Sequence, residues 1–177
     1  MNTLVLVGGI SREALNKRLF NEIVKHYNGK LSFSSFEIEN LPHFSQDIES
    51  DSPPVVEEFR AVVRAAQAVL LITPEYNRSY PGVLKNALDW GSRPWGQNLW
   101  SGKPVGIIGA SIGAIGTYGA QSHLKTVCSF LNMYIMHQPE FYGNASILFD
   151  DKGLTEKSLS FVHNYFEEFE KWISNFK

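Results

Sequence analysis

Residues 73–90 run TPEYNRSYPGVLKNALDW and directly follow a short apolar run at residues 68–72. The apolar run is typical of a strand that is buried on both faces of a parallel sheet. Pro74 and Asn77 then indicate a loop, and from Pro81 onward the apolar residues recur at helical spacing. The sequence therefore predicts a strand, a polar and aromatic loop, and a helix. In an open parallel sheet such a loop lies at the carboxyl edge, where ligands bind.

The same alternation of strand and helix extends along the whole chain. Amphipathic helices are predicted after each of a series of strands, which we place at residues 4–7, 31–38, 68–72, 104–110 and 133–138. This order predicts one α/β domain over residues 1–177, a doubly wound five-stranded parallel sheet in the order 2-1-3-4-5 with helices on both faces. In that order, the loops after strands 1 and 3 flank the point where the strand order reverses.

Composition narrows the class of protein. The chain has 177 residues, of which 44% are hydrophobic and 19% charged, as in a globular domain. Its net charge of -2 argues against a nucleic-acid partner, and no apolar run approaches the ~20 residues that span a membrane. Cys128 is the only cysteine and the histidines are scattered, so we expect a cytoplasmic protein without a metal site.

Residues 8–16, GGISREALN, join the first strand to its helix. Small residues, a hydroxyl at Ser11 and a cation at Arg12 stand where the helix begins. Free backbone amides, including those of Ala14 and Leu15, and the positive end of the helix dipole converge there. The sequence therefore predicts an anion site in this loop.

Residues 74–94 resemble the signature of the NAD(P)H-dependent FMN reductases, a flavodoxin-like family that includes quinone and chromate reductases. The matching residues are Pro74 to Asn77, Ser79, Pro81, Gly82, Leu84 to Ala87, Asp89, Trp90 and Ser92 to Pro94. Residues 8–19 are similar to the phosphate motif of the family at Gly8, Ser11, Asn16 and Leu19. The resemblance implies that an FMN phosphate occupies the anion site.

Two positions in the phosphate loop depart from the family pattern. Gly9 and Ala14 stand where the family often has serine, and the serine at the second position usually bonds the phosphate through its hydroxyl. One hydrogen bond to a charged group contributes roughly 1.5–3 kcal/mol. We therefore expect the chain to bind FMN more loosely than is usual in the family.

A third segment, residues 111–121, resembles a glycine-rich loop of the same family. Ser111, Gly113, Gly116, Ala120 and Gln121 match, whereas Thr117 replaces a glycine. The resemblance implies that Ser111 and its glycine neighbours lie near the flavin ring and that residues 74–77 wrap the ring edge, partly through backbone amides. The predicted cofactor-binding residues are Ser11, Arg12, Ala14, Leu15, Asn16, Pro74, Glu75, Tyr76, Asn77, Ser111 and Gly113.

The resemblance implies an oxidoreductase in which hydride passes from NADPH or NADH to bound FMN. Electrons then pass to a small acceptor, a quinone, a flavin or another compound, in a ping-pong cycle. Flavin carries this chemistry, so we assign no residue as a general acid or base. No Gly-x-Gly-x-x-Gly motif follows the first strand, so the nucleotide is expected to dock transiently over the flavin. Arg12 and Arg78 are both candidates to meet a 2′-phosphate, and the sequence does not choose between the two nucleotides.

Two other functions fit parts of the sequence. An FMN-binding electron carrier or regulatory module would use the same loops, and rapid reduction by NAD(P)H without another protein would distinguish it from an enzyme. Residues 109–113, GASIG, also match the Gly-x-Ser-x-Gly motif of serine hydrolases, with Asp150 or Asp151 and then His163 in hydrolase order. The hydrolase hypothesis leaves residues 74–90 unexplained.

The family resemblance also implies a homodimer or homotetramer. Tyr76 is expected to stack on the flavin or to lie in a subunit interface, and Glu75 and Arg93 either pair across that interface or are solvated loop charges. The last helix carries a second apolar stripe at Phe161, Tyr165, Trp172 and Phe176. An oligomer or a broad core helix explains this stripe equally well.

Overall fold

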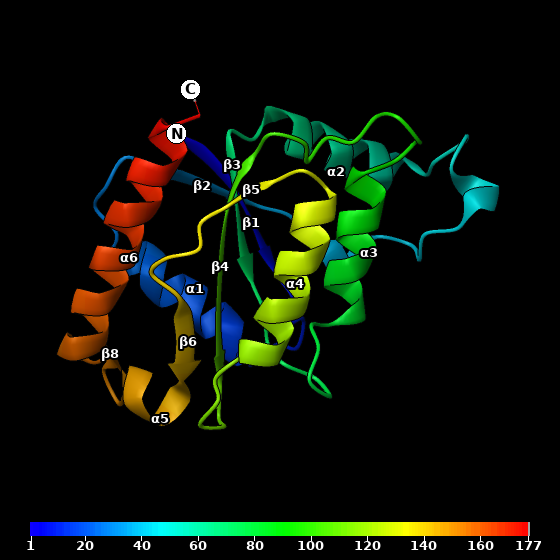
Figure 1. The fold of residues 1–177 in the computed structure, drawn as a ribbon. Helices are drawn as coiled ribbons and strands as arrows, with labels where there is room; N and C mark the ends of the chain where they lie inside the picture. Colours follow the sequence, from blue (N-terminus) through cyan, green and yellow to red (C-terminus); the bar gives the residue numbers. More distant parts are fainter. Residues whose placement is uncertain (177) are drawn as a thin grey trace.

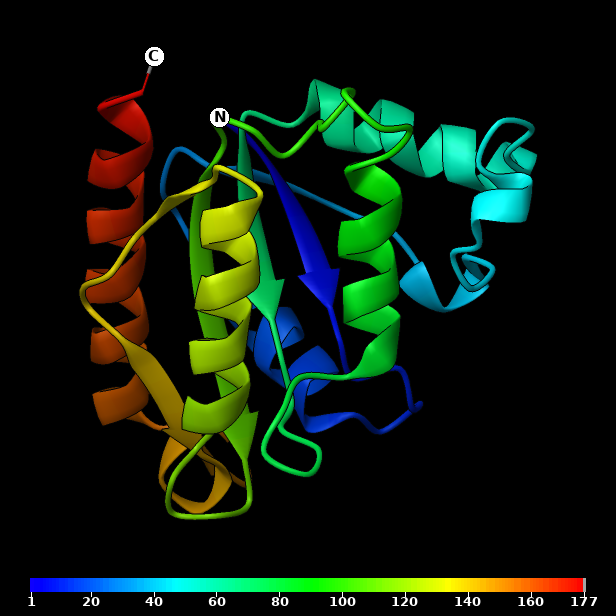
Figure 2. The ribbon, with the colours of Figure 1, turned by 45° about the vertical axis from the view of Figure 1, so that its right-hand side comes forward.

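A computed structural model describes residues 1–176 as a parallel sheet flanked by helices (Figures 1 and 2). The strands of the sheet are β1 (Asn2–Val7), β2 (Ser32–Ser35), β3 (Ala68–Ile72), β4 (Pro104–Ser111), β5 (Tyr134–Ile135) and β6 (Phe141–Asn144). The helices are α1 (Leu15–His26), α2 (Pro54–Ala65), α3 (Gly82–Gly91), α4 (Tyr118–Phe130), α5 (Ala145–Leu148) and α6 (Glu156–Ser174). A small antiparallel pair, β7 (Phe149–Asp150) and β8 (Gly153–Leu154), precedes α6.

The strand order is β2-β1-β3-β4-β5, which confirms the predicted sheet. The fifth position differs from the prediction, because residues 133–138 form only the two-residue strand β5. The chain then leaves the sheet and returns as β6, which pairs with the carboxyl half of β4 from Ile108↔Phe141 to Ser111↔Asn144. Pro139 separates the two strands, and proline cannot donate a hydrogen bond to a ladder.

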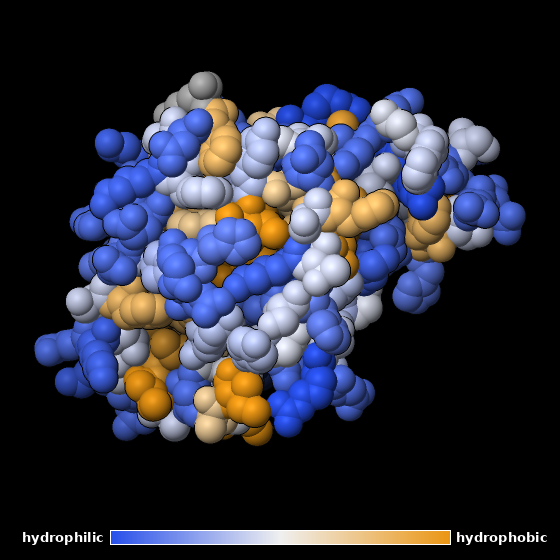
Figure 3. Space-filling model, viewed as in Figure 1, coloured by the Kyte–Doolittle hydropathy of each residue, from blue (hydrophilic) through white to orange (hydrophobic). Residues whose placement is uncertain are grey.

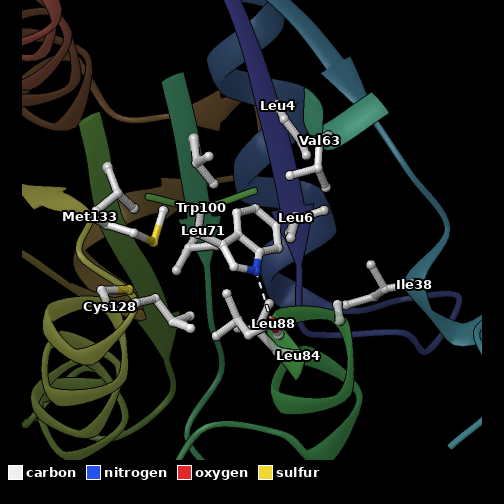
Figure 4. Close-up of a cluster of buried hydrophobic side chains, with 14 of the residues drawn as sticks. Leu4, Leu6, Ile38, Val63, Leu71, Leu84, Leu88, Trp100, Cys128 and Met133 are labelled. Atoms are coloured by element: carbon white, nitrogen blue, oxygen red, sulfur yellow. Dashed lines mark hydrogen bonds between the residues drawn. The ribbon is translucent and has the colours of Figure 1, made fainter. Parts of the chain in front are cut away.

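The two faces of the sheet carry separate cores. Helices α2, α3 and α4 cover one face, where Trp100 is fully buried and its indole Nε1 donates to the carbonyl oxygen of Leu88 at 2.8 Å (Figure 4). Helices α1 and α6 cover the other face, around Leu19, Ile23 and Phe166. Because both faces are covered, the central strand β3 is apolar throughout, as the run at residues 68–72 predicted.

The second apolar stripe of α6 is divided between the core and the surface. Tyr165 is fully enclosed, with its hydroxyl donating to the carbonyl oxygen of Ile107 at 3.4 Å, and burial raises its pKa. The Trp172 indole donates to the carbonyl oxygen of Tyr134 at 2.8 Å. The core therefore accounts for Tyr165, whereas Phe161 and Phe176 each keep 38% of their surface exposed. Across residues 1–176, no helix is both long enough and apolar enough to cross a membrane.

Candidate functional site

Three loops meet at the carboxyl edge of the sheet, the lower edge in Figures 1 and 2: residues 8–14 after β1, 73–81 after β3 and 112–117 after β4. The Gly8 amide donates to the carbonyl oxygen of Ile72 at 2.8 Å. A Cβ atom at Gly8 would lie 3.4 Å from Pro74 Cδ and 3.3 Å from Pro81 Cγ. The loops after β1 and β3 therefore lie side by side, as the strand order predicted.

The loop after β1 leaves the amino-terminal end of α1 open. Ala14 is the N-cap residue and its side chain makes no capping hydrogen bond, and the first turn has no acidic residue. The amides of Leu15, Asn16 and Lys17 find no acceptor among residues 1–176, while Ser11 and Arg12 are exposed beside them. Free amides at the positive end of a helix dipole are donors that suit a phosphate.

Asn16 is the residue that fixes this helix end to the sheet. Its side chain is 2% exposed and bonds both main-chain groups of Ala110 on β4: Nδ2 donates to the carbonyl oxygen at 3.0 Å, and the Ala110 amide donates to Oδ1 at 2.8 Å. The side chain therefore positions the loop, whereas the Asn16 backbone amide is available to an anion. The match of Asn16 to the family motif could not distinguish these two roles.

The loop after β3 is closed by its own backbone. The amide of Tyr76 donates to the carbonyl oxygen of Ser79 at 2.8 Å, and the amide of Ser79 donates to the carbonyl oxygen of Tyr76 at 3.0 Å. The two residues between them, Asn77 and Arg78, have φ angles of 51° and 67°, which is the left-handed conformation of a tight two-residue turn. The turn leaves the Tyr76 side chain 55% exposed at the edge of the site.

The Glu75 side chain points toward helix α4. Its carboxylate Oε2 accepts the amide hydrogen of Ala120 at 3.1 Å, and its Oε1 lies 3.5 Å from Arg78 Nη1. Only 11% of the Glu75 side chain is exposed. Within the chain Arg93 is near a different carboxylate, that of Glu49, with 3.9 Å between Nη1 and Oε1. The Glu75 carboxylate is therefore directed at α4, and the part of Glu75 that borders the edge of the sheet is its main chain.

The loop after β4 is braced from two sides. The Ser111 hydroxyl donates to the carbonyl oxygen of Gly116 at 2.6 Å, and Asn144 Nδ2 donates to the carbonyl oxygen of Gly113 at 3.3 Å. Gly116 has a φ angle of 65° and packs so closely on the main chain of Tyr142 that a Cβ atom would lie 2.8 Å from its carbonyl carbon. These contacts hold the Ser111 to Gly116 turn beside the other two loops.

Two tyrosines near the site, Tyr80 and Tyr142, have raised pKa values. Burial, together with the nearby Asp89 carboxylate, raises the pKa of Tyr80, which lies in the loop after β3. Burial and a hydrogen bond to Glu140 raise the pKa of Tyr142, whose hydroxyl donates to Glu140 Oε1 at 2.6 Å. Both phenols therefore stay protonated at neutral pH, and neither can accept a proton there.

The residues of the hydrolase hypothesis have separate partners. His163 Nε2 lies 3.3 Å from the carbonyl oxygen of His26, and the Ser111 hydroxyl is engaged within its own loop. Asp150 uses its carboxylate to accept the Lys152 amide at 2.7 Å. The part of the chain that the structure describes thus contains no Ser-His-Asp contact. It also contains no group of His, Cys, Asp and Glu suited to a metal ion.

Sequence reasoning missed the contribution of α4 and β6 to the site. Gly119 and Ala120 meet the loop after β3, and His123 Nδ1 lies 3.1 Å from Ser79 Oγ. Asn144 was missed because β6 was not predicted. The only local signal for the contact with α4 was a glycine in the first turn of a helix, where alanine is otherwise favoured.

The chain has the features of the flavodoxin-like class of flavin-binding proteins. Its parallel sheet is doubly wound, the helix at the switch point has an uncapped end, and glycines let the neighbouring loops approach closely. The donor set fits FMN, since open amides suit its phosphate and close backbone approach suits a flat ring. The family model described as NADPH-dependent FMN reductase matches residues 1–146, and the chain belongs to this family.

Relatives and solved structures agree with this assignment. The chain is 43% identical over 172 residues to a 2-hydroxy-1,4-benzoquinone reductase from Burkholderia sp, covering 96% of this chain and 94% of the relative. It is 41% identical over 172 residues to a quinone reductase from Pseudomonas putida, covering 96% and 92%. The structure of FerB, a flavoenzyme NAD(P)H:(acceptor) oxidoreductase from Paracoccus denitrificans, matches with a TM-score of 0.92 at 38% identity, covering 99% of this chain and 98% of FerB.

These findings confirm the predicted family, cofactor and enzyme class. The protein is an FMN-dependent oxidoreductase that uses NAD(P)H. Neither the electron-carrier hypothesis nor the hydrolase hypothesis is needed to explain the three loops at the carboxyl edge of the sheet.

Proposed function

We propose that the enzyme transfers electrons from NAD(P)H through FMN to quinones in a ping-pong cycle, with both substrates using one open face. The names of the two most similar relatives quoted above support a quinone acceptor. The observation that carries the proposal is the meeting of three loops around the uncapped end of α1, which provides a phosphate site beside two backbone walls.

Each loop has its own part in this proposal. Ser11, Arg12 and the amides of Leu15 and Asn16 hold the phosphate beside Ala14, whose own amide is not free as predicted but donates to the carbonyl oxygen of Ser11 at 3.1 Å. The main chain of Pro74, Glu75, Tyr76 and Asn77 borders the ring edge, and Ser111 and Gly113 border it from the loop after β4. Bound FMN supplies the two-electron chemistry, accepting hydride from the nucleotide and passing electrons to the acceptor. The protein residues orient the ring and leave one face of it accessible.

The rim of the site suits a flat apolar acceptor. Hydrophobic side chains come to the surface among polar ones along the lower edge in Figure 3. On the loop after β4, the exposed fraction is 91% for Ile112 and 51% for Ile115. The flat, conjugated ring of a quinone can contact such side chains without needing a specific hydrogen-bond partner, which fits tolerance of several acceptors.

The assembly state and location belong to the proposal as well. We expect residues 1–177 to act as one FMN-binding domain in the cytoplasm, as a homodimer or homotetramer in which Tyr76 is covered. Light scattering of the eluting protein with and without FMN measures the assembly. A monomer under both conditions would contradict this part of the proposal.

An anaerobic spectral titration tests the function. The purified protein loaded with FMN should lose its yellow absorbance on addition of NADH or NADPH, without any other protein, and regain it on addition of 1,4-benzoquinone. Parallel double-reciprocal plots are expected for a ping-pong cycle, and the two nucleotides titrated side by side reveal the preferred donor. A flavin that stays oxidised with both nucleotides would overturn the proposal.

A further inference from the structure

The amino-terminal end of α4 is capped by a residue from a distant loop. The N-cap residue Thr117 makes no side-chain capping bond, and the first turn of α4 contains no acidic residue. Glu75 supplies both the missing cap and the missing negative charge, because its Oε2 accepts the Ala120 amide hydrogen at 3.1 Å. A carboxylate in this position satisfies a free amide and lies favourably in the field of the helix dipole.

Gly119 makes room for this contact. A Cβ atom at Gly119 would lie 3.1 Å from Glu75 Oε2 and 2.9 Å from the carbonyl oxygen of Arg78. Any larger residue at this position would push the turn of residues 76–79 away from α4. The glycine therefore has a steric reason to occupy a helical turn in which alanine would otherwise be more stable.

The same turn is attached to α4 at a second point. His123 Nδ1 lies 3.1 Å from Ser79 Oγ, one helical turn beyond the Glu75 contact. Between these points the chain passes through Asn77 and Arg78 in the left-handed conformation, which asparagine tolerates but which is unfavourable for Arg78. Contacts on both sides of the turn hold it in this conformation.

We propose that Glu75 is a positioning residue that clamps the turn of residues 76–79 onto α4, so that the main chain of residues 74–77 is a fixed wall of the flavin site before FMN arrives. Glu75 acts through α4 and not by touching the flavin. This inference rests on the proposed placement of FMN against the same loop. A site formed in advance binds more tightly, because binding then orders fewer residues.

Two glycines provide a matched test. Gly119 and Gly82 both lie in the first turn of a helix, but a Cβ atom at Gly82 would meet nothing within 4 Å. Titration of apoprotein with FMN, followed by the quenching of flavin fluorescence, gives the Kd. We expect Gly119→Ala and Glu75→Ala each to weaken FMN binding about tenfold, as loss of a charge-assisted hydrogen bond would. Gly82→Ala should leave the Kd unchanged.

The conservative variant separates a clamp from a direct contact. Glu75→Gln keeps an oxygen that can accept the Ala120 amide hydrogen, so its FMN Kd should stay within about threefold of wild type. The double variant Glu75→Ala with Gly119→Ala should bind no more weakly than either single variant, because both changes release the same turn. If the two effects multiply, or if Glu75→Gln binds FMN as weakly as Glu75→Ala, Glu75 does not act through its bond to α4 and the clamp is overturned.

Hydrogen exchange of the apoprotein tests the clamp without FMN. The Ala120 amide should exchange faster in Glu75→Ala than in wild type, and at nearly the wild-type rate in Glu75→Gln. Equal exchange in all three proteins would refute the clamp even if FMN binding changed. A wild-type protein that binds no FMN would instead refute the proposed function, and the exchange result would still decide the clamp.

Discussion

The loops after β1 and β3 border the same site and are built in opposite ways. The loop after β1 leaves the amides at the start of α1 open and keeps Ser11 and Arg12 exposed. The loop after β3 satisfies its own backbone and directs its carboxylate into α4. The difference follows from the two ends of the ligand, because a phosphate needs donors that are not already used, whereas a flat ring needs a wall that does not move.

The source of rigidity also differs between the two loops. The loop after β1 depends on one buried side chain, Asn16, which bonds Ala110 on β4. The loop after β3 depends on its internal turn and on contacts with α4 through Glu75 and Ser79. Substitutions in the two loops should therefore have different consequences for stability and for FMN binding.

The largest effect is expected at Asn16. Replacing it with leucine leaves the amide and carbonyl of Ala110 buried without partners, so Asn16→Leu should lower the free energy of unfolding by about 3 kcal/mol. Urea denaturation of the apoprotein measures this loss. Asn21→Ala, an exposed change on the same helix, is the control and should stay within about 0.5 kcal/mol of wild type. A stable Asn16→Leu protein would show that the loop after β1 has another anchor.

A serine at Ala14 should strengthen the phosphate site. The new hydroxyl stands at the open end of α1 and adds one hydrogen bond to a charged group, so Ala14→Ser should tighten FMN binding about tenfold. Fluorescence titration measures the Kd, with Ala61→Ser on the exposed face of α2 as the control. If the melting temperature rises while the Kd is unchanged, the hydroxyl caps the helix and does not reach the phosphate.

A smaller effect is expected at Arg12. Its side chain is exposed beside the open helix end, where solvent screens its attraction to a phosphate. Arg12→Ala should weaken FMN binding about threefold at low salt and have almost no effect at high salt. Arg64→Ala, an exposed change on α2, should have no effect at either salt concentration. A loss that persists in high salt would mean that Arg12 makes a direct, desolvated contact.

The smallest effect is expected in the turn after β3. Arg78 is strained at a φ angle of 67°, and its ion pair with Glu75 is weak because 74% of the arginine side chain is exposed. Arg78→Gly should raise the free energy of unfolding by about 0.5 kcal/mol. Glycine removes the strain of the left-handed conformation, but it also gives the unfolded chain more conformational freedom, which offsets part of the gain. Arg78→Ala keeps the strain and should show no gain in denaturation. A loss in the glycine variant would mean that the pair with Glu75 outweighs the strain.

Much of the architecture was predictable because it is encoded locally. Apolar runs at residues 68–72 and 104–110 are long enough to be buried strands, and the helical spacing after Pro81 is unambiguous. The fifth strand was predicted less well, because residues 133–138 are apolar but Pro139 divides the edge of the sheet into β5 and β6. Propensity alone does not indicate which of two short segments a neighbouring strand will accept.

The sequence by itself determined the alternation of strands and helices, the loops that lie at the carboxyl edge and the family to which the chain belongs. Only the tertiary structure decided what the side chains in those loops do. Asn16 bonds a residue 94 positions away and Glu75 bonds one 45 positions away. Periodicity and turn chemistry act between neighbours in sequence, whereas the partner of a buried polar group depends on which elements pack against it.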